Sequence, residues 1–282
     1  MNSNKPLVSV IMGTYNSEKV LSRGIESILN QTYTHIEFVI CDDGSADNTL
    51  TILKQYASED NRIVVLQNEQ NSGLSTALNR CVEAAKGTFI ARMDDDDISH
   101  PDRIEKQLDY MLKFPEYVIA GTGANIFDEN GIWGQRSFCG ERGKNDIYLG
   151  KTFIHPSVMM RKDALNAVGN YTVSPSVMRT EDYDLWCKFY YNGYKGANMP
   201  DFLLDYCESA TSVKRRKYRY RLVNFKLMLH WRKKLSLPVH YSLYAFKPLI
   251  AGLIPRQILL NVKMRNIDRK KINTAPMNET NC

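Results

Sequence analysis

Four consecutive aspartates, Asp94–Asp97, directly follow the apolar run Phe89–Met93. Like charges repel one another, and acidic runs of this kind usually form a solvated loop. Alternate carboxylates at the end of a strand can also hold a hard divalent cation, Mg²⁺ or Mn²⁺, that binds a diphosphate as well. The position of this run, at the carboxyl end of a strand of an α/β sheet, favours the cation interpretation, because ligands bind at that edge.

Two further acidic motifs leave more than one interpretation open. The first, Asp42–Ser45, suits a β-turn, and its carboxylates could also accept a hydrogen bond from a base N–H. The second, Arg179–Asp182, opens a helical pattern with Thr180 as a suitable N-cap and acids at the positive end of the helix dipole. Capping explains this second motif best from local sequence, and a general base beside an acceptor hydroxyl is the functional alternative.

Other phosphate-binding motifs fail on spacing. The segment Gly121–Gly123 lacks the third glycine of a dinucleotide fingerprint, because Ile126 occupies that position. The segment Gly150–Thr152 lacks the leading glycine of a P-loop, because Asn145 stands there. The sequence therefore gives no support to a dinucleotide oxidoreductase or a P-loop NTPase. A lone histidine such as His155 is more often structural than catalytic.

The elements that must position these residues alternate between strand and helix. Apolar, β-branched runs predict strands at Leu7–Met12, Ile36–Cys41, Ile63–Leu66 and Thr88–Met93. Helical periodicity falls between them, at about 20–29, 47–58 and 74–85. Strands that are apolar on both faces indicate a parallel sheet covered by helices on both sides, an α/β fold.

Further elements follow the aspartate run. We expect Ser99 to cap the next helix, as Ser17 is expected to cap the first one. Patterns typical of strands occur at 117–127, 132–138 and 157–161, and helical patterns at 162–168 and 181–191. The dipeptide Asn130-Gly131 predicts a hairpin turn between the first two of these strands.

Charge divides the 282 residues into two parts. Residues 1–212 carry a net charge of −9, and residues 213–282 carry +15, because only Asp268 and Glu279 are acidic in the second part. We therefore expect a main domain over 1–212 and a basic helical extension over 213–282. The six cysteines form no CxxC pair and are irregularly spaced, which predicts reduced thiols in a cytoplasmic protein. The first six residues contain no apolar segment, so we expect no signal peptide.

The basic extension has three interpretations. The segment 214–221 (KRRKYRYR) mixes basic and aromatic side chains, as nucleic-acid-binding segments do. Apolar patches over 235–262 make an anionic membrane surface the better partner. A subdomain packed on the main domain is as well supported as the membrane surface. The charge-free run Pro248–Pro255 is too short to cross a bilayer.

Taken in order, several motifs resemble the family 2 inverting glycosyltransferases of the GT-A fold, over about residues 6–210. The motifs are Val8–Ile11 with Thr14–Asn16, Ser27–Tyr33, Asp42–Ser45, Asn71–Leu74, Ala91–Asp97, His100–Arg103 and Glu181–Trp186. Each motif is short, and their order and spacing make the resemblance specific. It implies a Rossmann-like, mostly parallel sheet flanked by helices.

The resemblance also implies roles for individual residues. Residues lining the nucleotide pocket would be Thr14, Tyr15 and Asn16, and Asp42 would contact the base, which is expected to be uracil. The DxD element would consist of Asp94 at the ribose and Asp96 at the metal and diphosphate, with Asp95 in the variable position. In this comparison Asp182 matches the catalytic base.

These roles predict an enzyme that uses Mn²⁺ or Mg²⁺ and a nucleotide-sugar donor, a UDP-sugar in particular. The acceptor would be a hydroxyl of a saccharide or a lipid-linked saccharide in bacterial surface polysaccharide synthesis, at the inner face of the cell membrane. Two alternatives are a nucleotidyltransferase and a catalytically silent sugar-nucleotide or membrane-docking module. The sequence Gly13–Asn16 lacks the basic, glycine-rich triphosphate loop of the former, and retention of Asp96 and Asp182 argues against the latter.

Overall fold

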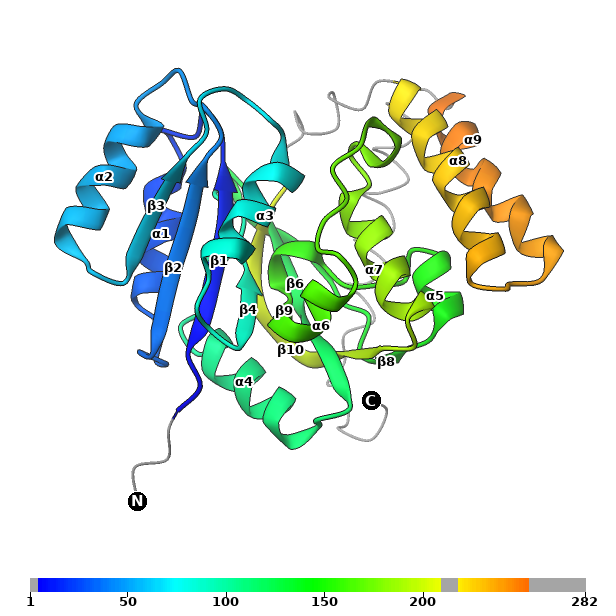
Figure 1. The fold of residues 1–282 in the computed structure, drawn as a ribbon, viewed down its shortest axis with the longest axis horizontal. Coiled ribbons are helices and arrows are strands. Elements are labelled where there is room, and N and C mark those ends of the chain that lie inside the picture. The colour runs from blue at the N-terminus through cyan, green and yellow to red at the C-terminus, as the bar shows by residue number, and fades with distance from the viewer. Residues whose placement is uncertain (1–4, 209–217, 254–282) are drawn as a thin grey trace.

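A computed structural model describes residues 5–208 and 218–253 of the chain. Within these ranges, one mixed sheet of ten strands forms the centre of the molecule, with helices on both of its faces (Figure 1). The α/β class predicted from the sequence is confirmed. The strands run in the order β3-β2-β1-β4-β9-β6-β10-β5, and β7 and β8 pair with β6 and β10 respectively.

The bounds of the strands follow. They are β1 Val8–Thr14, β2 Ile36–Asp42, β3 Ile63–Gln67, β4 Phe89–Arg92, β5 Ile98–Ser99, β6 Tyr117–Asp128, β7 Gly131–Arg136, β8 Gly140–Arg142, β9 Met159–Arg161 and β10 Lys195–Cys207.

The α-helices are α1 Leu21–Leu29, α2 Thr49–Glu59, α3 Leu74–Ala84, α4 Arg103–Lys113, α5 Lys144–Tyr148, α6 Lys162–Ala167, α7 Glu181–Tyr191, α8 Tyr218–Lys234 and α9 Lys247–Leu253. Short 3₁₀ helices are η1 His155–Ser157, η2 Pro175–Val177 and η4 Val239–Phe246.

The first half of the sheet is parallel, as the alternating pattern predicts. Strand β1 pairs in parallel with β2 and with β4, and β2 pairs in parallel with β3. Successive residues of β1 face opposite layers: Ile11 packs with the core that contains Leu78 of α3, whereas Val10 and Met12 pack with Ile25 of α1. Burial on both faces explains the unbroken apolar run of this strand.

The second half of the sheet is mixed. Strand β9 is antiparallel to both β4 and β6, and β6 runs parallel to β10. The long strand β10 was not predicted, because polar residues and Pro200 interrupt its apolar pattern, and its pairing with β6 shifts register between Asn198 and Phe202. A two-residue strand, β5, pairs with its end. These pairings hold the loop that follows β4 against the end of β10.

Two predicted helix caps are wrong. Helix α4 begins after Asp102, and Ser99 lies instead in β5, where it pairs with Leu204. Helix α1 begins after Val20, and the Ser17 hydroxyl donates to Asp95. Both serines therefore hold the aspartate loop in place, Ser17 through its side chain and Ser99 through the backbone pairing of β5 with β10.

The described part of the C-terminal extension packs on the main domain. In α8, the side chains of Leu227, Met228 and Trp231 are buried in the same core as Leu185 of α7. The proposed boundary at residues 212 and 213 lies outside the described residues, as does the first half of the segment 214–221, residues 214–217. None of the helices in the described ranges is both long and apolar enough to cross a membrane.

Candidate active site at the carboxyl edge of the sheet

A cavity of about 510 Å³ lies at the carboxyl ends of β1 and β2, where the polar segments were expected to meet. We call it the sheet-edge cavity. Its walls come from the end of β1, from Asp43, from the start of α3 and from residues 172–179, with Glu181 of α7. The chain therefore brings segments from both halves of the sheet together around one hollow, as an open α/β sheet does for its ligands.

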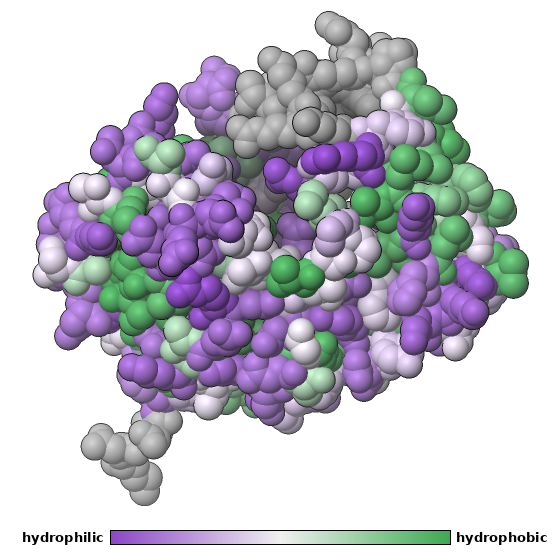
Figure 2. All heavy atoms as spheres, turned by 45° about the horizontal axis from the view of Figure 1, so that its top comes forward, coloured by the Kyte–Doolittle hydropathy of each residue, from purple (hydrophilic) through white to green (hydrophobic). Residues whose placement is uncertain are grey.

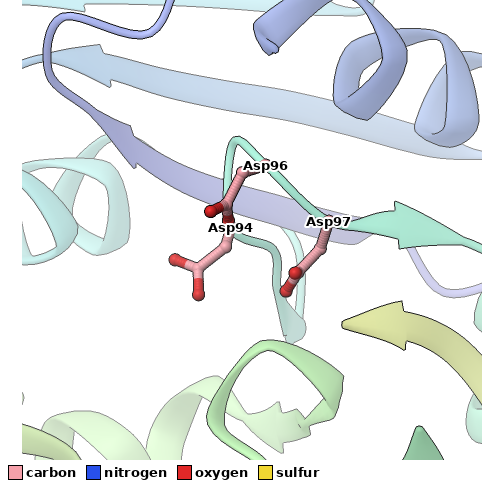
Figure 3. Close-up of side chains that lie close together, drawn as sticks. All are labelled: Asp94, Asp96 and Asp97. Atoms are coloured by element: carbon pink, nitrogen blue, oxygen red, sulfur yellow. The ribbon is translucent and has the colours of Figure 1, made fainter. Parts of the chain in front are cut away.

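The aspartate run forms the loop between β4 and β5. Asp94, Asp96 and Asp97 converge on one side of this loop (Figure 3), and one carboxylate oxygen of each lies within 4.8 Å of the others. The backbone of α1 approaches this loop closely: a Cβ atom on Gly24 would lie 3.1 Å from the carbonyl oxygen of Asp95. The sequence assigned Asp96 to the metal, and the structure adds Asp94 and Asp97 to the same cluster.

The fourth aspartate, Asp95, has different partners from its neighbours. Its Oδ2 accepts hydrogen bonds from the hydroxyls of Thr14, at 2.7 Å, and Ser17, at 2.5 Å. These bonds join the aspartate loop to the end of β1. Both Thr14 and Asp95 were expected to bind the nucleotide, and in this structure their side chains bind each other.

Burial raises the pKa of Asp96 to about 7, with further increases from the charges of Asp94 and Asp95. The pKa of Asp97 is also raised, by burial first and then by Asp94 and Asp96. Oδ1 of Asp97 accepts the backbone N–H of Cys207 at 2.7 Å, whereas its Oδ2 has no hydrogen-bond partner among the described residues.

This donor set fits a hard divalent cation. Three carboxylates in close proximity, one of them with an unpartnered buried oxygen, are the oxygen ligands that Mg²⁺ and Mn²⁺ take. A cation would also offset the repulsion that, after burial, raises the pKa values of Asp96 and Asp97. The geometry therefore suits the cation that the sequence indicated.

A buried arginine, Arg92, lies beside this cluster at the end of β4. Its guanidinium forms a salt bridge with Asp94, and the side chain is almost fully buried. Burial alone would lower the pKa of Arg92, but Asp94, Tyr171 and Asp97 hold it above its ordinary value. A second buried arginine, Arg103 of α4, donates to the carbonyl oxygens of Arg92 and Pro156. These fixed cations compensate part of the negative charge of the loop.

The two carboxylates of the motif Asp42–Ser45 lie in different surroundings. Asp42 is fully buried at the end of β2 and accepts hydrogen bonds from Ser45, and it is not among the residues that line the sheet-edge cavity. Asp43 lines the cavity, and it accepts the backbone N–H groups of Ser72 at 2.9 Å and Gly73 at 2.8 Å. Asp43 is thus the carboxylate of this motif that faces the sheet-edge cavity, whereas Asp42, the predicted base contact, does not line it.

The motif after β1 contributes unevenly to the cavity. Tyr15 lines it with an exposed ring. Thr14 also lines it, and its hydroxyl is bonded to Asp95. Asn16 has a positive φ of 53°, and its side chain accepts the backbone N–H of Ala46 at 2.8 Å. The side chain of Asn16 therefore helps to hold the loop after β2 in its conformation.

The start of α7 carries the predicted general base. Glu181 lines the sheet-edge cavity, and burial together with the charge of Asp182 raises its pKa. Oδ1 of Asp182 accepts the backbone N–H of Tyr183 at 2.8 Å. Burial raises the pKa of the Tyr171 phenol. Arg92 lowers this pKa, and the charges of Asp182 and Asp94 raise it further. Tyr171 thus lies within electrostatic range of both the helix start and the aspartate cluster.

The phenol of Tyr171 is also the hydrogen-bond partner of His155. Nε2 of His155 lies 2.8 Å from the Tyr171 hydroxyl, and the ring packs edge-on against Trp186. Burial, and then the charge of Arg92, holds the pKa of His155 well below its ordinary value. The histidine is therefore a neutral, partly buried partner of Tyr171, which agrees with the structural interpretation of the sequence.

Sequence reasoning missed three contributors: Arg92, Tyr171 and Asp43. A charged residue inside an apolar strand was a visible signal for Arg92. Asp43 stands next to the predicted Asp42, and a strand that alternates its faces presents only one of two adjacent carboxylates to the cavity. Nothing in the local sequence distinguishes Tyr171 from other core tyrosines.

The sheet order, the carboxyl-edge cavity and the acidic loop after β4 agree with the GT-A type of glycosyltransferase that the sequence resemblance implies. Residues 9–169 match glycosyl transferase family 2. The chain belongs to this family and is a glycosyltransferase.

Several known proteins resemble the chain closely. It is 38% identical to the putative glycosyltransferase EpsE of Bacillus subtilis, over 96% of this chain and 98% of that protein. It is 32% identical to the amylovoran biosynthesis glycosyltransferase AmsE of Erwinia amylovora, over 90% of this chain and 96% of that protein. The chain thus has relatives in polysaccharide biosynthesis.

Solved structures confirm the GT-A fold. S. aureus TarS in complex with UDP-GlcNAc matches with a TM-score of 0.67 and 20% identity, over 85% of this chain and 72% of that chain. The mannosyltransferase PcManGT from Pyrobaculum calidifontis, in complex with GDP-Man and Mn²⁺, matches with a TM-score of 0.59 and 19% identity, over 93% of this chain and 80% of that chain.

Proposed function

We propose that the chain is a metal-dependent inverting glycosyltransferase that uses a nucleotide-sugar donor, a UDP-sugar. Its acceptor is a hydroxyl of a saccharide or lipid-linked saccharide of bacterial surface polysaccharide. The observation that carries this proposal is the convergence of Asp94, Asp96 and Asp97 on one loop. Asp95 of this loop accepts the hydroxyl of Thr14, which lines the sheet-edge cavity together with Asp43 and Glu181. The relatives in polysaccharide biosynthesis and the nucleotide-sugar complexes of TarS and PcManGT support the substrate classes.

Different residues would bind the nucleoside and the metal ion. Tyr15 and Asp43 bind the nucleoside part of the donor from the sheet-edge cavity. The carboxylates of Asp94, Asp96 and Asp97 hold Mn²⁺ or Mg²⁺. When bound, this cation acts as a Lewis acid that stabilises the negative charge of the departing nucleoside diphosphate.

The transfer itself needs one proton acceptor. The acceptor hydroxyl oxygen forms a bond to the anomeric carbon while the bond from that carbon to the diphosphate oxygen breaks, and the electron pair of that bond leaves with the nucleoside diphosphate. Asp182 takes the hydroxyl proton. A single displacement inverts the anomeric configuration and requires no covalent enzyme intermediate.

We further propose that the enzyme works at an anionic membrane surface. The described stretch 218–253 contains seven lysines and arginines and no acidic residue. Exposed hydrophobic side chains gather on the side of the molecule that carries α8 and α9 (Figure 2). A basic and apolar surface of this kind suits an anionic bilayer better than nucleic acid.

Calorimetric titration of UDP and of GDP, with and without Mn²⁺, tests the donor site. We expect UDP to bind in a metal-dependent manner. A preference for GDP would overturn the assignment of the base, and failure of both nucleotides to bind with metal present would overturn the enzymatic proposal in favour of a silent module. Asp182→Asn should retain UDP binding and lower kcat by about 10²–10⁴-fold, and unchanged turnover would exclude Asp182 as the base.

A further inference from the structure

A second cavity, of about 300 Å³, lies between the main domain and the C-terminal extension. We call it the tail cavity. Its walls come from the turn after α5, the start of α7 and the three elements α8, η4 and α9. The proposed transfer reaction assigns it no role.

Three cations and no acidic residue line the tail cavity: Arg179, Arg221 and Lys247. None of the three takes part in an ion pair found within residues 5–208 and 218–253. Arg221 uses one N–H to donate to the carbonyl oxygen of Pro248, at 3.0 Å, which fixes its position against α9. Three positive charges around one hollow, without carboxylates among its walls, are complementary to a phosphate or diphosphate.

The tail cavity adjoins the sheet-edge cavity. Arg179 and Tyr220 line both cavities. Asp182, the proposed base, lies in sequence between Glu181, which lines the sheet-edge cavity, and Tyr183, which lines the tail cavity. A molecule in the tail cavity would therefore lie beside the start of α7, which carries Asp182.

An apolar rim lies on the same elements that close the tail cavity. We define it as Leu243 of η4 and Ile250 and Leu253 of α9, whose side chains are 73%, 59% and 75% exposed. The cavity-lining residues Tyr244 and Ala251 directly follow Leu243 and Ile250 in the chain. Large exposed aliphatic side chains next to a cationic cavity match an amphiphile with an anionic head and a hydrocarbon chain.

We propose that the tail cavity binds the phosphate or diphosphate group of a lipid-linked saccharide acceptor, while the apolar rim contacts its hydrocarbon chain. This inference rests on the proposed function and names the class of acceptor. Arg179, Arg221 and Lys247 hold the anionic group, and the saccharide extends past Arg179 towards Asp182. The lipid-linked acceptor thus binds between the membrane and the donor.

Sedimentation with vesicles tests this assignment without relying on activity. The vesicles contain phosphatidylcholine alone, phosphatidylcholine with a polyprenyl diphosphate, or phosphatidylcholine with phosphatidylglycerol at equal surface charge. A chelator removes divalent cations, so that the aspartate cluster contributes no diphosphate binding. We expect the full-length protein to prefer the polyprenyl diphosphate vesicles. Equal binding to both anionic vesicles would overturn the assignment, because it would indicate a general electrostatic contact.

Matched variants locate the binding site. Lys247→Gln and Arg179→Gln should each reduce the preference for polyprenyl diphosphate about tenfold, the effect of losing one charge-assisted hydrogen bond. Lys226→Gln and Lys233→Gln remove the same charge from exposed positions of α8 that do not line the cavity, and they should preserve the preference. Equal losses in both pairs would overturn the proposal.

The apolar rim distinguishes a lipid-linked acceptor from a soluble one. Leu243→Ser with Ile250→Ser should weaken binding to the polyprenyl diphosphate vesicles, whereas Leu112→Ser, on exposed α4, should not. If the rim variant has no effect and inorganic pyrophosphate displaces the protein completely, the ligand is a soluble phosphate and the lipid assignment is wrong. UDP binding of Lys247→Gln with Mn²⁺, measured in parallel, shows separately whether the proposed donor site holds.

Discussion

The indole N–H of Trp231 donates a hydrogen bond to Oδ1 of Asp184 at 2.8 Å. Trp231 belongs to α8 of the basic extension, and Asp184 lies in the first turn of α7, two residues after the proposed base. The other carboxylate oxygen of Asp184 accepts the hydroxyl of Thr172 at 2.6 Å. The extension is therefore tied to the helix that presents Asp182, so it is part of the structure that positions the site.

Loss of this hydrogen bond should destabilise the protein. Trp231→Phe keeps most of the buried ring but leaves Oδ1 of the buried Asp184 without its partner, which costs about 1–3 kcal/mol of unfolding free energy. Urea denaturation measures the change. In a double-mutant cycle, Trp231→Phe should cost less in the Asp184→Ala background, because the partner is already gone. Independent, additive effects would show that the bond does not contribute.

The four aspartates should separate into two functional classes. In the presence of UDP, Asp96→Asn and Asp97→Asn should each weaken Mn²⁺ binding more than about tenfold, since even indirect partners of metal ligands contribute that much. Asp95→Asn should retain Mn²⁺ binding and lower Tm, because this carboxylate accepts hydrogen bonds from Thr14 and Ser17. Calorimetry and thermal unfolding provide the two readouts. A loss of Mn²⁺ affinity in Asp95→Asn equal to that in Asp96→Asn would contradict the division.

Local sequence predicted the parallel half of the sheet because its strands are apolar on both faces. It also placed the polar strand ends and the aspartate run at one edge. It did not predict β10, whose polar residues and Pro200 break the strand pattern and whose pairing is set by contacts with β6. The choice between Asp42 and Asp43, and the turn of Asp95 towards Ser17, depend on tertiary contacts that no local pattern encodes.

Asp43 should matter more than Asp42 for nucleotide binding. Asp43→Ala removes a carboxylate that lines the sheet-edge cavity, and UDP affinity should fall about tenfold or more, as expected for a hydrogen bond to a charged group. Asp42→Asn should change UDP affinity less, because Asp42 is enclosed and bound to Ser45. Calorimetric titration with UDP and Mn²⁺ compares the two. The opposite order would restore the original assignment to Asp42.

Glu181 should make stability depend on pH in a defined direction. Burial and the charge of Asp182 raise its pKa above the ordinary value of 4.5, so the folded state binds the proton more tightly than the unfolded state. Its favourable contribution is complete below pH 4.5 and is lost as the pH rises through the folded pKa. Above that pH, the buried charge opposes folding. Glu181→Gln removes the ionisation and should raise Tm at neutral pH.

The pH profile distinguishes ionisation of Glu181 from a packing effect of the amide. The gain in Tm from Glu181→Gln should shrink as the pH falls towards 4.5, since protonated glutamic acid and glutamine are both neutral. Glu59→Gln is the matched control, because it makes the same exchange at an exposed position at the end of α2 and should leave Tm unchanged across the range. Differential scanning calorimetry at several pH values measures both variants. A gain that stays constant with pH would mean that side-chain packing, and not the charge of Glu181 beside Asp182, limits the stability of this helix start.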